Sequence, residues 1–275
     1  MTCAWKELMD VLPPGLREQV RYMESDGIQE IRLRLGQVPE LVFGNKSTWL
    51  KGLTTCDDLN FCINSASRYS PWATRSMECG YLTSAGGHRI GVCGEVVIKN
   101  GAMTGIRTVS SLCIRVARDF QNIGEFVASR SGSLLIIGPP GSGKTTLLRD
   151  LIRCISTSSH VGVVDERGEL FPTGFNRGSR VDVMTGCTKA HGIEILLRTM
   201  GPDVIAVDEI TAQEDCKALV QAWWCGVSIV ATAHAGSVRD LRSRPLYKPI
   251  VDSGLFDHVF VMGRDKSWRE ERLYG

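Results

Sequence analysis

The octet at residues 138–145 constrains the fold of this chain more than any other feature. It reads Gly138-Pro-Pro-Gly-Ser-Gly-Lys-Thr145 and fits the Walker A pattern G-x-x-x-x-G-K-[ST]. In that pattern backbone N–H groups turn inward to cradle phosphate oxygens, which glycines permit because they lack a Cβ. The apolar run 134–137 precedes the octet as a buried strand, and a helical pattern follows from Lys144. The sequence therefore predicts a strand, loop and helix that bind a nucleotide, rather than a Gly/Pro turn that matches by chance.

Each part of the octet has an expected task. Lys144 would neutralise the β- and γ-phosphates, and the Thr145 hydroxyl would bind Mg²⁺. The positive end of the dipole of the following helix would face the same anion. The expected cofactors are ATP and Mg²⁺. The residues expected to bind the nucleotide are Gly138, Pro139, Pro140, Gly141, Ser142, Gly143, Lys144, Thr145 and Thr146.

Two further strands end in carboxylates. Residues 204–209 read Val-Ile-Ala-Val-Asp-Glu, like a Walker B segment, and ligand sites in parallel sheets lie at the carboxyl ends of strands. Asp208 would hold Mg²⁺ with Thr145, and Glu209 would polarise the attacking water, unless both are solvated loop carboxylates. The strand 161–164 leads into further acidic residues, of which Glu166 is an alternative base. The sequence leaves the choice between Glu209 and Glu166 open.

One histidine and a group of arginines complete the candidate catalytic residues. His234 follows the apolar strand 227–233, where it would sense the γ-phosphate or serve as an ordinary structural hydrogen-bonding group. An arginine that stabilises transition-state charge would come from Arg167, Arg177, Arg180 or Arg198, in the same chain or across a subunit boundary. Flanking motifs favour Arg180 and Arg198.

Composition limits the partners and the compartment. Thirty-two basic and thirty acidic side chains give a net charge of +2, so a nucleic acid is not the expected main partner. Ten cysteines without a C-x-x-C pair predict free thiols in a reducing cytoplasm. No signal peptide and no apolar stretch near the ~18 residues of a membrane span appear in the sequence. Membrane attachment would therefore go through a partner protein.

The chain divides into two halves of different pattern. Residues 1–122 predict a small α+β domain, with strands at 31–35, 40–43, 91–98 and 114–117 and a helix at 57–69. Residues 123–275 predict an α/β domain with a parallel sheet covered on both faces. Its expected strands are 134–137, 161–165, 204–208 and 228–233, and its helices 144–154, 192–200 and 212–225. A long loop is expected after 165, and a final strand near the charged stretch 264–272 would be short or missing.

Several motifs carry a resemblance to known families. The run 192–210, which contains R-x-x-x-P-D before the two carboxylates, resembles the type II/IV secretion ATPase superfamily. Residues 164–169 are similar to its Asp box, and residues 231–234 to its His box. Segments 29–36, 80–83, 86–92 and 114–118 resemble stage III sporulation protein AA. The chain departs from the family pattern at His191 and Thr211.

The resemblance implies a RecA-like, AAA+-related P-loop ATPase that hydrolyses ATP with Mg²⁺. It also implies a homo-oligomeric ring, of which a hexamer is one form, that works with membrane-embedded sporulation channel proteins between mother cell and forespore. Two other functions stay open. One is a nucleotide-gated assembly scaffold with little turnover, and the other is a RecA-like motor stimulated by nucleic acid.

Overall fold

The computed structural model describes residues 2–23, 27–44, 46–67, 80–99, 102–172 and 174–273. The chain forms two compact units. Unit 1 comprises Met1–Asp119 with Pro172–Phe175, and unit 2 comprises Phe120–Phe171 with Asn176–Gly275. That the units fold as independent domains stays a prediction. Among the described helices, none combines the length and the apolarity that crossing a membrane requires.

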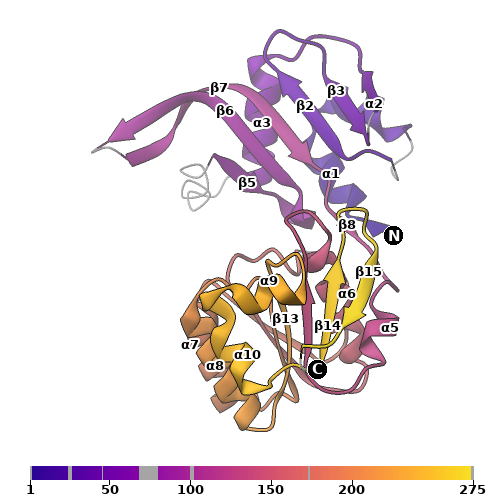
Figure 1. Ribbon diagram of the computed structural model, residues 1–275. Helices are drawn as coiled ribbons and strands as arrows, with labels where there is room; N and C mark the ends of the chain where they lie inside the picture. Colours follow the sequence, from indigo (N-terminus) through magenta and orange to yellow (C-terminus); the bar gives the residue numbers. More distant parts are fainter. Residues whose placement is uncertain are drawn as a thin grey trace. The chain divides into compact units, whose positions relative to one another are not determined.

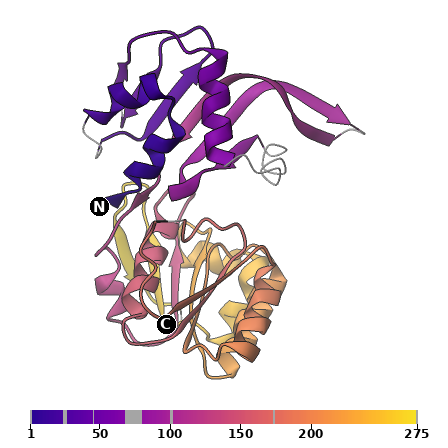
Figure 2. The ribbon, with the colours of Figure 1, turned by 180° about the vertical axis from the view of Figure 1, so that it is seen from behind.

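Unit 1 is built on an antiparallel sheet (Figure 1). Side chains alternate along its strands, so that Ile31 and Leu33 enter the core while Arg32 faces away from it. Three helices supply the other side of that core, and Figure 2 shows them in indigo and violet in front of the sheet. The sheet order is β4-β3-β2-β7-β6-β5, with β2 Glu30–Arg34, β3 Glu40–Phe43, β4 Lys46–Trp49, β5 Tyr81–Thr83, β6 Arg89–Lys99 and β7 Ala102–Arg115. The helices are α1 Trp5–Val11, α2 Pro14–Arg21 and α3 Cys56–Ser67, with the 3-10 turn η2 Ala85–Gly87.

The helix expected at 57–69 is α3, which begins one residue earlier because Thr55 and Asp58 exchange side-chain and backbone hydrogen bonds at its start. Residues 68 and 69 lie outside the described residues. The strand expected at 114–117 is the end of β7, which stops at Arg115. A further short pair joins β1 Thr2–Cys3 to β8 Arg118–Asp119.

Unit 2 contains a sheet of seven described strands in the order β11-β10-β12-β13-β9-β14-β15. Neighbouring strands are parallel except for the last pair, β14 and β15, which is antiparallel. The predicted α/β fold with a parallel sheet is therefore confirmed. The strands are β9 Leu134–Ile137, β10 Val161–Asp165, β11 Val181–Thr185, β12 Val204–Val207, β13 Ser228–Ala233, β14 His258–Met262 and β15 Trp268–Glu271.

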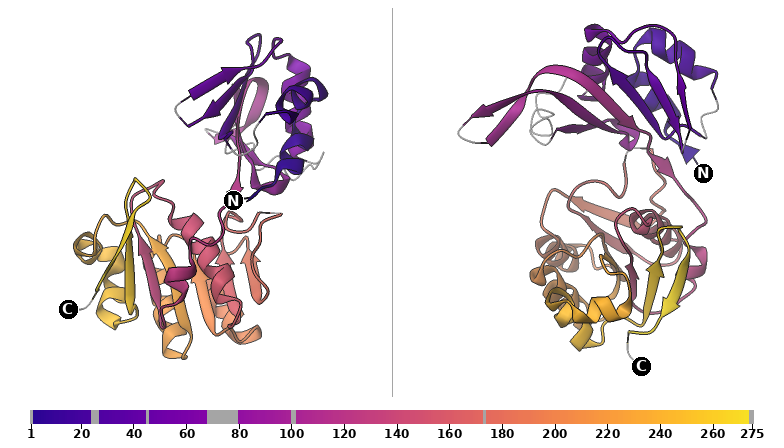
Figure 3. Two further views of the ribbon diagram at one scale, coloured as in Figure 1. Left: turned by 90° about the vertical axis from the view of Figure 1, so that its right-hand side faces the viewer. Right: turned by 45° about the horizontal axis from the view of Figure 1, so that its top comes forward.

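Helices cover both faces of this sheet (Figure 3, left). Alternate residues of β9 point to opposite faces of the sheet. Leu135 and Ile137 pack in one core, with α7, α8 and α10, and Leu134 and Ile136 pack in a second core, with α5 and α6. Strands buried on both faces explain the uninterrupted apolar runs of the sequence. The helices are α5 Glu125–Ala128, α6 Lys144–Ile155, α7 Lys189–Thr199, α8 Gln213–Trp224, α9 Val238–Ser243 and α10 Lys248–Ser253, with the 3-10 turn η3 Pro245–Tyr247.

Two expectations for the second half were wrong, and one strand was not predicted. The loop expected after residue 165 contains β11, an edge strand whose side chains are only partly buried, so its apolar signal is weak. The final strand, β15, is short, as expected, whereas β14, which was not predicted, pairs in parallel with β9 inside the sheet. Helix α7 begins at Lys189 instead of residue 192, because the Thr188 hydroxyl caps it by accepting the N–H of His191.

The structure describes the side chains of eight of the ten cysteines. The eight whose side chains are described are free thiols, and no group of three or more potential metal-binding His, Cys, Asp or Glu side chains occurs in the described ranges. Burial raises the pKa of the Cys62 and Cys216 thiols to about 12, so both stay protonated. Cys79 lies outside the described residues.

Candidate functional site

Three neighbouring parallel strands deliver the candidate residues to one edge of the unit 2 sheet. The loop of residues 138–143 follows β9, Asp208 and Glu209 follow β12, and His234 follows β13. Strand β13 pairs with both β9 and β12. Because these strands are parallel and adjacent, their carboxyl ends open onto the same site.

The geometry of the loop depends on its glycines. Gly141 and Gly143 have φ values of 73° and 98°, in the left-handed region that side chains rarely adopt. At Gly138 the limit is space, because a Cβ would lie 2.8 Å from the Met262 carbonyl oxygen and 2.7 Å from Ser142 Oγ. Met262 ends β14, the strand that sequence patterns did not reveal. The close approach of β14 thus explains why residue 138 is a glycine.

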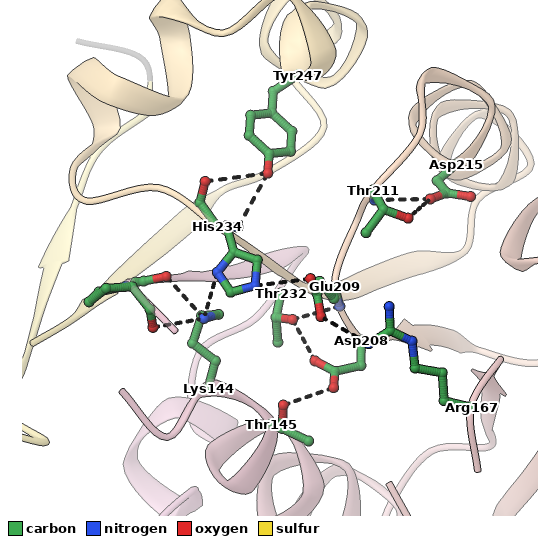
Figure 4. Close-up of polar contacts among 12 residues, drawn as sticks. Lys144, Thr145, Arg167, Asp208, Glu209, Thr211, Asp215, Thr232, His234 and Tyr247 are labelled. Atoms are coloured by element: carbon green, nitrogen blue, oxygen red, sulfur yellow. Dashed lines mark hydrogen bonds and ion pairs between the residues drawn. The ribbon is translucent and has the colours of Figure 1, made fainter. Parts of the chain in front are cut away.

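Lys144 begins α6, and its ammonium group is held at the mouth of the loop (Figure 4). Its Nζ donates to the carbonyl oxygens of Gly138 at 3.0 Å and Pro139 at 3.1 Å, and it lies 3.3 Å from His234 Nδ1. The residue is only 6% exposed. Burial lowers the pKa of Lys144, while the nearby carboxylates of Asp208 and Glu209 act in the opposite direction.

His234 links Lys144 to Glu209. An ammonium group can only donate, so His234 Nδ1 accepts from Lys144 and the ring proton lies on Nε2. That Nε2 lies 3.0 Å from Glu209 Oε1 and donates to it. Tyr247 fixes the backbone of His234, because its hydroxyl accepts the His234 N–H at 3.2 Å and lies 3.4 Å from the carbonyl oxygen. The sequence did not assign Tyr247 to the site, and the residue reaches His234 from η3.

Asp208 is oriented by two hydroxyl groups. Thr145 Oγ1 donates to Asp208 Oδ2 at 2.8 Å, and Thr232 Oγ1 donates to Oδ1 at 2.6 Å. The structure therefore brings together the two residues expected to bind a metal ion. Carboxylate and hydroxyl oxygens are ligands that suit Mg²⁺.

Glu209 has a strained backbone with φ 51°, uncommon for a residue other than glycine. Its N–H donates to Thr232 Oγ1 at 2.7 Å, which helps to hold this conformation. The side chain lies between His234 and Arg167, whose Nη1 is 3.9 Å from Glu209 Oε2. Strain of this kind is common where a side chain must be aimed at a ligand.

A cavity of about 410 Å³ lies between the loop and the strand ends. It is lined by Pro140, Gly141, Gly143, Lys144, Thr145, Thr146, Asp208, Glu209, Thr232, His234 and Lys266. Glu166 does not line it. Glu166 lies instead on a small neighbouring cavity of about 30 Å³, where its Oε2 is 2.6 Å from the Nζ of the buried Lys189. Sequence analysis missed Lys189 because nothing near it in the chain suggested a partner.

Arg180 and Arg198 lie away from this cavity within one chain. Arg180 directly precedes β11 and donates to the Ser158 carbonyl oxygen, at the amino end of the strands. Arg198 is in the last turn of α7 and pairs with Glu194 at 2.7 Å. Both are exposed. A role for either in another subunit's site stays a prediction.

Together, the parallel sheet, the loop after β9 and the carboxylates after β12 define a RecA-like P-loop NTPase fold. The same architecture occurs in secretion and pilus ATPases. The structure of the ATPase DotB of Legionella pneumophila superimposes on this chain with a TM-score of 0.60 and 18% sequence identity. The match covers 95% of this chain and 80% of DotB. The pilus retraction motor PilT, solved with bound ADP, gives a TM-score of 0.64 and 18% identity over 93% of this chain and 77% of that one.

A more specific relationship follows from the sequence comparisons. The chain belongs to the family described as "Sporulation stage III, protein AA", whose model matches residues 5–272. Stage III sporulation protein AA of Bacillus subtilis (strain 168) is 36% identical over 282 aligned residues, which cover 94% of this chain and 91% of that protein. The resemblance to this family and to the secretion ATPases is thereby confirmed.

Proposed function

We propose that this chain hydrolyses ATP with Mg²⁺ and acts as an assembled ring during sporulation. The observation that carries the proposal is the convergence of Lys144, Thr145, Asp208, Glu209 and His234 on one cavity beside a phosphate-binding loop. The family membership supports the link to sporulation. The likeness to DotB and PilT supports an ATPase fold.

The residues present fit a nucleotide with its metal ion. The hydroxyl of Ser142 is buried and has no hydrogen-bond partner in the described part of the chain. The loop glycines Gly141 and Gly143 line the cavity and, having no side chains, leave it open. Thr145 and Asp208 would hold Mg²⁺, which when bound would neutralise charge on the phosphate oxygens.

Binding of the nucleotide would change the contacts of Lys144 and His234. Lys144 would exchange its contacts with the Gly138 and Pro139 carbonyl oxygens for phosphate oxygens, which attract an ammonium group far more strongly than neutral carbonyls. His234 would lose Lys144 as a partner in the same exchange and would keep its contact with Glu209. We call the cavity of about 410 Å³ the phosphate cavity. A ligand bound in it would in this way change the surroundings of Glu209.

Glu209 is the better candidate to position the attacking water. Its carboxylate lines the phosphate cavity, and its Oε1 is already oriented by His234. Glu166 is committed to a short ion pair with Lys189 outside that cavity. Because a general base must reach the water near the phosphate, position favours Glu209 over Glu166.

The ring would supply a further arginine to the site, in addition to Arg167 of the same chain. An arginine from a neighbouring copy, Arg180 or Arg198, would stabilise the charge of the transition state. Membrane-embedded proteins of a channel between mother cell and forespore would be the partners that use the cycle. Recruitment from the cytoplasm would go through those partners.

The test is ATP hydrolysis by the purified chain, measured over a range of protein concentrations while its mass in solution is followed. We expect turnover to rise as the chain assembles. Glu209→Gln is expected to reduce turnover by at least about a hundredfold and to keep ATP binding, whereas Lys144→Ala is expected to lose binding. Glu214→Gln, a change at an exposed residue of α8 that does not line the cavity, is the matched control and is expected to leave turnover unchanged.

Two outcomes would replace the proposal. Tight ATP binding without turnover at any concentration would indicate a nucleotide-gated scaffold. Turnover that depends on DNA or RNA and falls steeply with salt would indicate a nucleic-acid motor. Unchanged ATP affinity in Lys144→Ala would reject the phosphate-binding assignment itself.

A further inference from the structure

A second cavity of about 550 Å³ adjoins the phosphate cavity in unit 2. The two share three lining residues, Gly143, Thr146 and Lys266, so the cavities are direct neighbours. The remaining lining is mostly apolar, in contrast to the phosphate cavity. It consists of Phe120, Ile123, Ser142, Leu147, Met262 and Trp268.

Large apolar side chains are exposed around this second cavity. Phe120 is 39% exposed, Ile123 is 42% exposed and Trp268 is 39% exposed. A group of exposed apolar side chains in a concave site, beside a few polar groups, is typical of a ligand pocket. Because this pocket adjoins the phosphate cavity, it suits the apolar part of a ligand whose phosphates bind in that cavity.

The Trp268 ring is held in position by two other aromatic rings. Its centroid lies 5.2 Å from that of Phe126 and 5.5 Å from that of Phe260, the latter in an edge-on arrangement. These distances are those of favourable aromatic pairs. A ring that is fixed in advance loses little conformational entropy when a planar group stacks on it.

Lys266 lies in the turn between β14 and β15 and lines both cavities. Its φ of 69° is in the left-handed region, which a residue other than glycine adopts only when its surroundings hold it there. Its Nζ donates to the carbonyl oxygen of Gly141 in the phosphate loop. The hairpin β14–β15 therefore brings a second ammonium group to the phosphate cavity and an aromatic ring to the apolar one.

We propose that the β14–β15 hairpin recognises the nucleotide: the apolar cavity receives a purine base beside Trp268, and Lys266 contacts the phosphates. The proposal rests on the proposed function, since it concerns the same nucleotide. A purine presents two apolar faces and is joined through its sugar to the anionic phosphates, which matches an apolar cavity next to one with two lysines. The larger purine ring system also stacks more extensively than a pyrimidine.

The experiment compares a ligand that carries a nucleoside, ATP, with one that has the phosphate chain alone, inorganic tripolyphosphate. Binding of each to the full-length chain is measured by calorimetry with Mg²⁺. Trp268→Ala is expected to weaken ATP binding by about tenfold or more and to leave tripolyphosphate binding unchanged, because only ATP carries a base to stack. Lys266→Met is expected to weaken both ligands. Trp224→Ala, which removes a tryptophan that is 72% exposed and lines neither cavity, is the control.

Further variants separate stacking from a general loss of structure. Trp268→Phe keeps an aromatic ring and is expected to restore most of the ATP affinity. Phe120→Ala probes the same cavity from outside the hairpin, so the test holds even if changes at Trp268 prevent folding. ATP and GTP are expected to bind more tightly than CTP and UTP.

The possible failures are distinguishable. If Lys144→Ala loses both ligands but Trp268→Ala and Phe120→Ala bind ATP normally, the phosphate site stands and the base site is rejected. Equal weakening of ATP and tripolyphosphate by Trp268→Ala would also reject it, and equal affinity for all four nucleotides would reject the purine preference. If the unaltered chain binds neither ligand, the proposed function fails as a whole.

Discussion

At the scale of single residues, we propose that His234 responds to the bound nucleotide. It contacts both Lys144 and Glu209 and is fixed by Tyr247. We expect His234→Ala to lower ATP turnover by about a hundredfold while ATP affinity changes little, the size of effect seen when one aligned donor is removed from a catalytic site. Steady-state rates and calorimetric binding measure the two quantities. His234→Gln, which keeps a side-chain donor, is expected to recover part of the rate, and full activity of His234→Ala would contradict the sensing role.

A second residue-scale prediction concerns stability at acid pH. His88 in unit 1 is fully buried, accepts the N–H of Ala117 at Nδ1 and lies 2.9 Å from the Ala4 carbonyl oxygen at Nε2. Burial lowers the pKa of His88 below its ordinary value of about 6.5. In the unfolded chain the imidazole takes up a proton at a higher pH than in the folded chain. The contribution of His88 to the free energy of unfolding is therefore fully present above about pH 6.5. It is lost as the pH falls towards the pKa that His88 has in the folded chain.

The prediction is a decrease in the melting temperature of the chain as the pH is lowered from 7 to 5. His88→Asn, which cannot be protonated, is expected to reduce this pH dependence even though it is less stable at pH 7. His160→Asn changes an exposed histidine and serves as the control. An identical pH dependence in His88→Asn and the unaltered chain would contradict the role assigned to His88.

At the scale of elements, α7 packs close to β10 through a glycine. A Cβ at Gly192 would lie 2.6 Å from Val164 Cγ1 and 2.9 Å from Cγ2. An alanine normally stabilises a helix relative to glycine by about 1 kcal/mol, but Val164 is a buried and β-branched side chain with little room to move. We therefore expect Gly192→Ala to lower the free energy of unfolding by about 1–3 kcal/mol, measured by urea denaturation. His191→Ala, an exposed change one position away, should alter it by less than about 0.5 kcal/mol, and a stabilised Gly192→Ala would show that α7 can move.

At the scale of the whole molecule, we expect Arg198 to act in the site of a neighbouring copy of the chain, because Arg180 and Arg198 lie away from the cavity in their own. Arg198→Ala and Glu209→Gln are each expected to be inactive alone. When the two are mixed, a site can combine Glu209 of one subunit with Arg198 of its neighbour, so activity should return. The rate of the mixture against each variant alone is the measurement. If Arg198→Ala is inactive alone and the mixture forms rings but stays inactive, Arg198 does not contribute to a site shared between subunits.

Much of unit 2 could be predicted from the sequence because its signals are local. The octet ending in Thr145 and the carboxylates Asp208 and Glu209 follow apolar runs, and parallel strands deliver their carboxyl ends to one edge. Strand β11 gave a weak signal because an edge strand is only partly buried. Strand β14 was overlooked beside a charged carboxyl-terminal stretch, although its five residues are largely apolar.

The sequence by itself determined the phosphate loop, the strand ends that carry the acidic residues and the class of fold, since each depends on residues that are neighbours in the chain. Only the tertiary structure decided how these groups are paired. The link from Lys144 through His234 to Glu209, the ion pair of Glu166 with Lys189 and the approach of Lys266 to the loop each join residues 23 or more positions apart. No local pattern encodes such pairs, because the packing of the sheet and its helices sets which side chains meet.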